Sequence, residues 1–166
     1  MKKLIITYLL VIFFCSSSFA QTLPTRKPGL WSLSMEMNGK QRPGGKQCID
    51  ASTDKAMLDA GNNLKSGMGV NCTKNESKKD GEKFIIETDC MMNNTRMVSN
   101  IVFEGDFNSA YISTMNTKYD PSFMGQTSMK VVTTAKYEGP CQDGQLPGDM
   151  ILPNGMKMNL NDLGKK

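Results

Sequence analysis

The stretch RMVSNIVFEGDFNSAYISTMNTK, residues 96–118, decides the fold class. Its first half alternates between two sets of side chains, which are Met97, Ser99, Ile101 and Phe103 against Val98, Asn100 and Val102. Gly105-Asp106 is a turn pair, and the strand expected over 107–118 places Tyr111, Ser113, Met115 and Thr117 on one face. Alternation with a period of two on both sides of a short turn predicts a β-hairpin.

Similar strands are expected on either side of this hairpin. Alternating or β-branched runs predict strands at 29–37, with Trp31 on the apolar side, and at 46–49, 70–75, 83–91 and 127–137. Loops are expected at 38–45 and 119–125, and a charged turn at 76–82. Residues 21–28 are expected to form an extended lead-in. The tail 142–166, which has Gly, Pro and Asn at short intervals, is expected to be irregular.

One short helix interrupts this succession of strands. Residues 55–60 have helix-forming composition, Gly61 follows as a stop signal, and Ser52, Thr53 or Asp54 is the expected N-cap. The fold class is therefore mainly β (α+β). We expect one domain over residues 29–141, a curved antiparallel β-meander or partly open barrel with a single covering helix.

The N-terminus has the organisation of a secretory signal peptide over residues 1–20. Lys2 and Lys3 precede a nearly unbroken apolar run. A segment with small residues, which ends at Ala20, follows this run and predicts cleavage before Gln21. The run is too short for a typical transmembrane helix, which disfavours a retained anchor. Acylation of Cys15 is disfavoured because bulky side chains precede it. The expected location is periplasmic, with no transmembrane segment in the mature chain.

Composition excludes several function classes. The 166 residues contain no His, which excludes Ser-His-Asp and Cys-His catalysis and removes the commonest zinc and copper ligand. The formal net charge of +4 falls to +2 when Lys2 and Lys3 leave with the signal peptide. The remaining basic residues form no dense stripe, so nucleic-acid binding is disfavoured. No cofactor motif is present.

Four cysteines remain after cleavage, namely Cys48, Cys72, Cys90 and Cys141. An even number in an exported chain indicates disulfides. Cys72 and Cys90 flank the turn of an expected hairpin, which favours their pairing and leaves Cys48 for Cys141. The alternative is a thiolate metal site, and the absence of a Cys-x-x-Cys pair argues against it.

Two kinds of side chain offer alternative functions. The chain has 14 methionines, with close pairs at Met35/Met37, Met91/Met92 and Met156/Met158. Thioethers are soft ligands that select Cu(I), but methionine also fills irregular apolar cores. The carboxylates Glu104, Asp106, Asp120, Asp143 and Asp149 stand at turns or strand ends, where acidic residues are common for conformational reasons. None of them forms an evident catalytic pair, so a hydrolase is the weaker alternative.

Several motifs together resemble DUF3617, a family of exported bacterial proteins of unknown function. They are Lys27-Pro28-Gly29-Leu30-Trp31, Gln47-Cys48-Ile49 followed by Asp54-Lys55-Ala56, and the later Cys72 and Cys90. The resemblance extends from Pro28 to Cys141, and Ser32 stands where the family usually has Glu. It implies an exported β-rich domain and no reaction, so no catalytic residue is carried over.

These observations favour a non-enzymatic binding or envelope-associated protein. A strand-rich chain of this length, with flexible methionines and no catalytic constellation, is expected to present a concave sheet face. The expected partner of that face is a small apolar ligand or an envelope protein. Copper or oxidant handling by methionines and an unrecognised hydrolase are the alternatives.

Overall fold

The computed structural model describes residues 23–57 and 69–162. The predicted signal peptide, residues 1–20, lies outside them, as do residues 58–61 at the expected end of the helix. The strands are β1 Gly29–Met37, β2 Lys40–Arg42, β3 Lys46–Ile49, β4 Val70–Asp80, β5 Lys83–Met92, β6 Thr95–Gly105, β7 Ala110–Phe123, β8 Gln126–Gly139, β9 Asp149–Ile151 and β10 Lys157–Asn159. A 3₁₀ turn, η1, follows at Leu160–Asp162.

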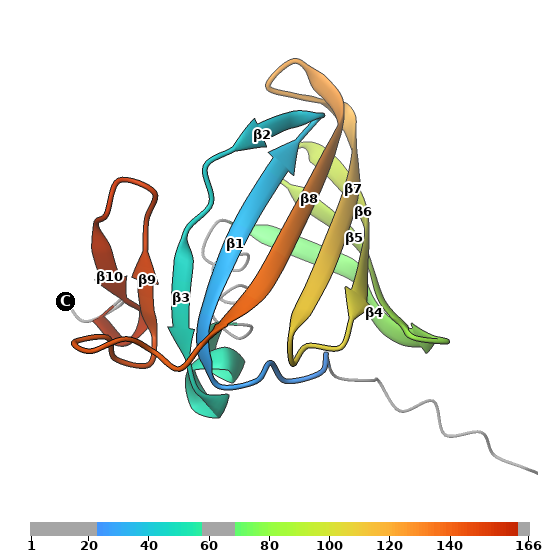
Figure 1. Cartoon of the computed structure of the whole chain (residues 1–166). Helices are drawn as coiled ribbons and strands as arrows, with labels where there is room; N and C mark the ends of the chain where they lie inside the picture. The colour runs from blue at the N-terminus through green and yellow to red at the C-terminus, as the bar shows by residue number, and fades with distance from the viewer. Residues whose placement is uncertain (1–22, 58–68, 163–166) are drawn as a thin grey trace, which may run out of the picture.

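All ten strands belong to one antiparallel sheet. Their order is β10-β9-β3-β1-β8-β7-β6-β5-β4, and β2 pairs with the far end of β1. The sheet curves strongly, so that β5 and β4 pass behind β1 and β8, while β9 and β10 extend to one side (Figure 1). The predicted fold class is confirmed. The sheet stays open, because β4 and β10 stand at opposite ends of the strand order.

The long meander β4–β8 has tighter turns than its sequence predicts. Residues 76–80 belong to β4, and the turn is reduced to Gly81 and Glu82. The charges that indicated a turn lie instead on an edge strand, where Lys78 binds Glu87 at 3.2 Å. The predicted loop 119–125 is likewise mostly strand, with Met124 and Gly125 as its turn.

Two segments expected to lack strands contribute short ones. The loop 38–45 contains β2, and the tail 142–166 contains β9 and β10. Gly44 and Gly45 connect β2 to β3 by crossing close to β1, where Gly45 O accepts a hydrogen bond from Leu33 N at 2.8 Å. A Cβ on Gly44 would lie 1.6 Å from Leu33 O, so only glycine fits there.

The α-helix in the described part of the chain begins earlier than expected. It starts at residue 51, and its N-cap is Asp50, whose Oδ1 accepts a hydrogen bond from Thr53 N at 2.8 Å. The predicted caps at 52–54 are therefore wrong. Asp54 has another role, because it is buried within the helix and binds Arg26. No helix in residues 23–57 or 69–162 is long and apolar enough to cross a membrane.

Candidate functional site

Strand register assigns the side chains of the curved sheet to two faces. Directly paired residues of antiparallel strands point to the same face. Trp31 pairs with Tyr137, and Ala135, two residues before Tyr137, pairs with Tyr111 on β7. Met57 of the helix packs against this cluster. We call the face that carries Trp31, and against which Met57 packs, the inner face.

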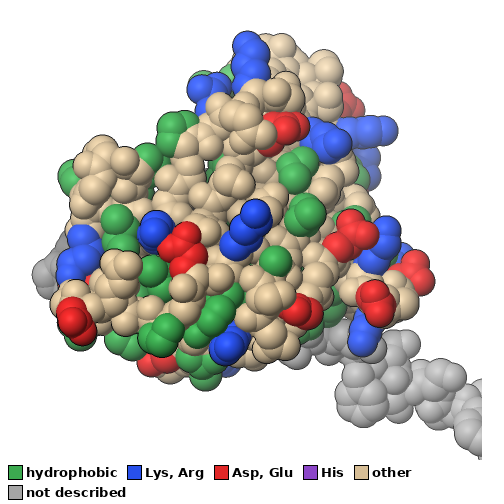
Figure 2. All heavy atoms as spheres, viewed as in Figure 1, with side chains coloured by type: hydrophobic (Ala, Val, Ile, Leu, Met, Phe, Trp, Pro, Cys, Tyr) green, Lys and Arg blue, Asp and Glu red, His purple; other side chains and the backbone are tan. Residues whose placement is uncertain are grey.

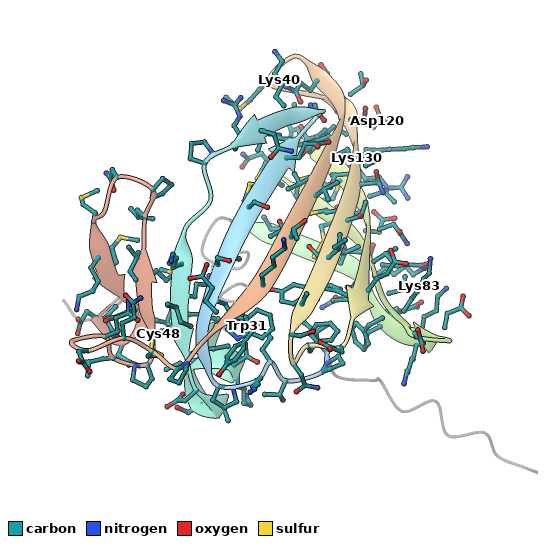
Figure 3. The ribbon with its side chains drawn as sticks, in the orientation of Figure 1. Trp31, Lys40, Cys48, Lys83, Asp120 and Lys130 are labelled. Atoms are coloured by element: carbon teal, nitrogen blue, oxygen red, sulfur yellow. A yellow bond between two sulfur atoms is a disulfide. The ribbon has the colours of Figure 1, made fainter. Side chains whose placement is uncertain are left out.

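One end of the inner face is closed by aromatic packing. Trp31 is fully buried, and its Nε1 donates a hydrogen bond to Lys27 O at 2.8 Å. Its ring centroid lies 5.8 Å from that of Tyr111 and 5.7 Å from that of Tyr137. Trp31 stands near the base of the sheet, and Lys40 stands at the opposite end (Figure 3). Aromatic side chains therefore fill the base of the inner face.

A structured turn adds Phe107 to this closed end. Asp106 Oδ1 accepts hydrogen bonds from the backbone N of Asn108 and Ser109 at 2.8 and 2.7 Å. These bonds, together with one from the Ser109 hydroxyl, hold the pKa of Asp106 well below its usual range. Phe107 adopts a φ of 58°, which is rare for a bulky residue, and its ring stacks on Tyr111 at 5.0 Å. Asp106 is thus a structural residue.

Further from the base, the inner face carries an apolar row that crosses five strands. We call it the apolar belt; in register order it consists of Met37, Val131, Met115, Ile101 and Ile86. Each of these side chains is only half-buried. At about 4.8 Å between neighbouring strands, the belt is about 19 Å long. It is an extended apolar strip with part of every side chain accessible.

The next row beyond the belt consists of one methionine and three residues with hydroxyl groups. Met129, Thr117, Ser99 and Thr88 follow one another across β8 to β5. Ser99 Oγ and Thr117 Oγ1 share a hydrogen bond of 2.9 Å, and the side chains of Thr88 and Thr117 are buried. No buried side-chain polar atom in residues 23–57 and 69–162 lacks a partner. The row therefore borders the belt without offering unsatisfied polar atoms.

Tyr119 supplies a polar group near the rim of this region. It pairs with Met97, and its hydroxyl contacts Met129 Sδ at 3.9 Å. Its ring lies 5.6 Å from that of Phe123. Burial raises the pKa of the Tyr119 phenol. In this arrangement the hydroxyl donates to the sulfur of Met129.

The inner face gathers six methionines from five strands. They are Met35, Met37, Met92, Met97, Met115 and Met129. Register separates some of the pairs that suggested copper: Met91 and Met92 are adjacent on β5 and therefore point to opposite faces. Met156 and Met158 lie in the tail, 57% and 38% exposed. Met35 and Met37 share the inner face.

Both disulfides join the expected partners. Cys48 and Cys141 connect β3 to the residues just after β8, and Cys72 and Cys90 occupy directly paired positions on β4 and β5. Cys90 points to the inner face and is buried. Cys48 lies near the base, close to the start of the β9–β10 segment (Figure 3). The bonds brace the sheet and are not arranged as a metal site.

The candidate carboxylates are not brought together as a catalytic pair. Glu104 binds Lys83 at 2.9 Å, and Asp106 is saturated by its own turn. In the described ranges, 23–57 and 69–162, no group of three or more Cys, Asp or Glu is placed to hold a metal ion.

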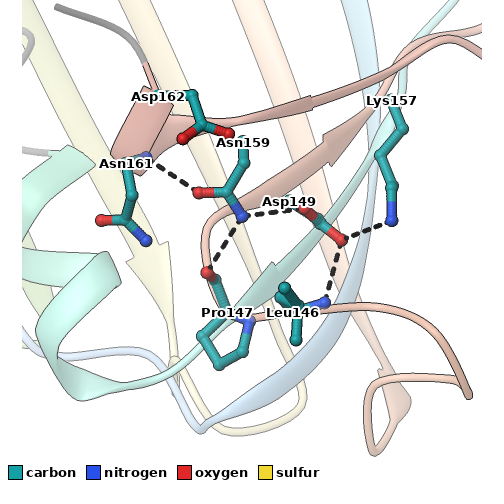
Figure 4. A pocket seen from close by; sticks show the side chains of 7 residues that line it. All are labelled: Leu146, Pro147, Asp149, Lys157, Asn159, Asn161 and Asp162. Carbon is teal, nitrogen blue, oxygen red and sulfur yellow. Dashed lines mark hydrogen bonds and ion pairs between the residues drawn. The ribbon is translucent and has the colours of Figure 1, made fainter. Parts of the chain in front are cut away.

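Asp149 lies in a separate cavity of about 410 Å³ in the tail (Figure 4). It accepts hydrogen bonds from Leu146 N and Asn159 Nδ2 at 2.9 and 2.8 Å and is 3.2 Å from Lys157 Nζ. Burial raises the pKa of Asp149, but these bonds outweigh that effect, and the net shift is downward. Because its oxygens are already bound, Asp149 holds the β9–β10 segment together and offers no free ligand.

The fold and the inner face define a disulfide-braced single-sheet β-protein with an aromatic end and, further along the same face, a half-buried apolar row. The chain belongs to the family described as "Protein of unknown function (DUF3617)", whose model matches residues 26–141. The predicted resemblance is confirmed. The matched range begins at Arg26, which binds Asp54, and ends at Cys141 of a disulfide, so β9 and β10 lie beyond it. No curated protein and no solved structure matches the chain.

Proposed function

We propose that the protein is an exported, non-enzymatic binding protein whose inner face holds the apolar chain of a small amphiphile. The observation that carries this proposal is the apolar belt. In a self-filled core such side chains are covered, as Trp31 and Ala135 are at 0% exposure, whereas every member of the belt is half-buried. An accessible apolar strip of this length on the inner face fits an extended hydrocarbon chain.

Methionine supports this choice of ligand. Its unbranched side chain and polarisable sulfur adapt to ligands of differing shape. Six methionines on the inner face therefore suit a flexible chain better than a rigid ligand. The opposite face of β1 and β8 has scattered hydrophobic side chains among Lys, Asp and Glu (Figure 2), which is ordinary for a solvated surface.

The periplasm is the proposed location. The charged and apolar N-terminal segment ending at Ala20 supports export, and the two disulfides suit an oxidising compartment. Mass mapping of the protein from the periplasmic fraction tests this location. We expect a mature chain that begins at Gln21 with both disulfides formed. An uncleaved chain in the cytosolic fraction, with four alkylatable thiols, would contradict it.

Binding is tested with the neutral fluorescent probe N-phenyl-1-naphthylamine. We expect a saturable rise in its fluorescence with the mature protein and its displacement by dodecanol. Met115→Glu places a charge in the middle of the belt, and we expect it to weaken probe binding at least about ten-fold, because a carboxylate resists burial beside an apolar chain. Ile112→Glu is the matched control, since Ile112 is on the same strand but on the outer face, 44% exposed.

Circular dichroism and disulfide mapping establish that both variants fold. The proposal fails if the wild-type protein gives no saturable signal, or if folded Met115→Glu binds the probe as tightly as Ile112→Glu. Native mass spectrometry of the protein isolated from the periplasm of its own cells shows whether the inner face holds a small molecule or an envelope protein. A stoichiometric envelope protein bound in place of a small molecule would overturn the amphiphile proposal.

A further inference from the structure

The acidic residues of the curved sheet are confined to one face. By register, the carboxylates of β1 and β4–β8 all point to the outer face: Glu36, Glu76, Asp80, Glu87, Asp89, Glu104, Asp120 and Glu138. Many are neutralised there, as in the pairs Lys83–Glu104 and Arg96–Asp89. The inner face of these strands carries no carboxylate.

The inner face has cations at its edges. On β2, Lys40 pairs directly with Met37, and Arg42 pairs with Met35. Lys79, on β4 at the opposite edge, pairs with Phe84. All three side chains are exposed, and Lys40 stands at the end of the sheet away from Trp31 (Figure 3). An apolar strip flanked by positive charge on the described strands β2 and β4 is complementary to an anionic amphiphile.

The β2 edge is the better head-group position. Lys40 continues the row of the apolar belt, next to Met37, and Arg42 lies two residues away on the same face. Neither forms an ion pair with any carboxylate of residues 23–57 or 69–162, in contrast to Lys46, which binds Glu138 at 2.6 Å. Their charges are consequently available to a ligand.

We propose that the ligand is a single-chain anionic amphiphile, with its hydrocarbon chain along the apolar belt and its carboxylate or phosphate head group beside Lys40 and Arg42. This inference rests on the proposed binding function and specifies its ligand class. Because both cations are exposed, their attraction for the head group is screened by salt, while the contact of the chain with the belt is not. The affinity therefore has a salt-dependent part and a salt-independent part.

Four probes with the same twelve-carbon chain test the inference: dodecanoate, dodecyl phosphate, dodecanol and dodecyltrimethylammonium. The assay measures how well each probe displaces N-phenyl-1-naphthylamine from the mature protein at low and at high salt. Acetate serves as the control anion without a hydrocarbon chain. We expect both dodecyl anions to bind about ten-fold more tightly than dodecanol at low salt. The cationic probe should bind more weakly than dodecanol, and acetate should not displace the dye.

Lys40→Gln/Arg42→Gln should reduce the preference for anions over dodecanol to within about two-fold, with dodecanol affinity unchanged. Lys118→Gln/Lys130→Gln removes the same charge from the outer face of β7 and β8 and should retain the preference. Equal wild-type affinity for the anions and dodecanol, or a preference that survives Lys40→Gln/Arg42→Gln, overturns this inference and leaves the proposed function standing. Failure of every probe to displace the dye rejects both, and a difference between the two anions identifies the head group.

Discussion

Arg26 and Asp54 form an ion pair that fixes the start of the domain. Arg26 Nε lies 2.7 Å from Asp54 Oδ1, and the two side chains are 10% and 5% exposed. Arg26 also donates from its backbone N to Asp54 Oδ2 at 2.9 Å and from Nη1 to Gln47 Oε1 at 2.9 Å. The pair thus joins the lead-in, the helix and β3 in one cluster.

Replacing Arg26 with Met leaves the Asp54 carboxylate buried without its counter-ion. Removing one partner of a buried pair costs about 3–5 kcal/mol. We expect the lower end, about 3 kcal/mol, because the backbone N of residue 26 still donates to Asp54 in the variant. Urea unfolding of the mature protein at pH 7, followed by Trp31 fluorescence, measures the change, since Trp31 is the single tryptophan of the chain.

Two further variants make this reasoning refutable. Lys46→Ala breaks the Lys46–Glu138 pair, which has a similar distance of 2.6 Å but exposures of 45% and 34%, and it should cost less than about 1 kcal/mol. The double variant Arg26→Met/Asp54→Leu removes both buried charges and should be more stable than Arg26→Met alone. A loss below about 1 kcal/mol for Arg26→Met, or a double variant less stable than Arg26→Met, refutes the assignment.

Other expectations concern the disulfides and acid stability. Replacing Cys48 and Cys141 with Ser should lower the free energy of unfolding by about 4–5 kcal/mol, because that disulfide closes a loop of 93 residues. Replacing Cys72 and Cys90 with Ser should lower it by about 3 kcal/mol, because the closed loop spans 18 residues. Urea unfolding that gives the larger loss for the Cys72–Cys90 variant contradicts the loop-closure argument. Asp106 has a folded pKa below its unfolded value, so its stabilising contribution is present above about pH 4 and is lost as pH falls through the folded pKa. The stability difference between wild type and Asp106→Asn should therefore be constant near neutral pH and shrink below about pH 4; a difference that grows on acidification argues against this role.

The meander and its inner face were predictable because both follow from alternation. The strand pattern over 96–118 places Tyr111 and Met115 on one face, and the register confirms that assignment. Two disulfides were predictable from cysteine number, and their partners followed from one hairpin. Local patterning is sufficient for these features because sheet side chains alternate strictly.

Features that depend on distant pairing were not predictable. The tail sequence around Asp149 is rich in turn residues, and β9 forms only because β3 offers it an edge. The charged residues 76–80 of β4 indicated a turn, since the contact of Lys78 with Glu87 follows only from the pairing of β4 with β5. Asp54 was assigned to capping because Arg26, its ion-pair partner, lies 28 residues earlier. Tertiary contacts override local preference at each of these places.

The cationic edge of the inner face could not be predicted from the sequence for a related reason. Lys40 and Arg42 fall in a stretch that reads as a loop, and only the pairing of β2 with β1 puts them on the face of Met35 and Met37. The basic residues of the sequence are scattered, so composition alone gives a nearly balanced surface. Segregation of charge between the two faces becomes visible only once the register is known.

Methyl NMR of methionine most directly tests whether the inner face binds an apolar chain. The mature protein, labelled with ¹³C at the methionine methyl groups, is titrated with dodecanoate. The account predicts saturable shifts for inner-face methyl groups, above all Met37 and Met115 of the apolar belt, and none for Met91 and Met124, which point away from it or stand in a turn. Shifts confined to Met91, Met124 or the tail, or no saturable shift in Met37 and Met115, would contradict it.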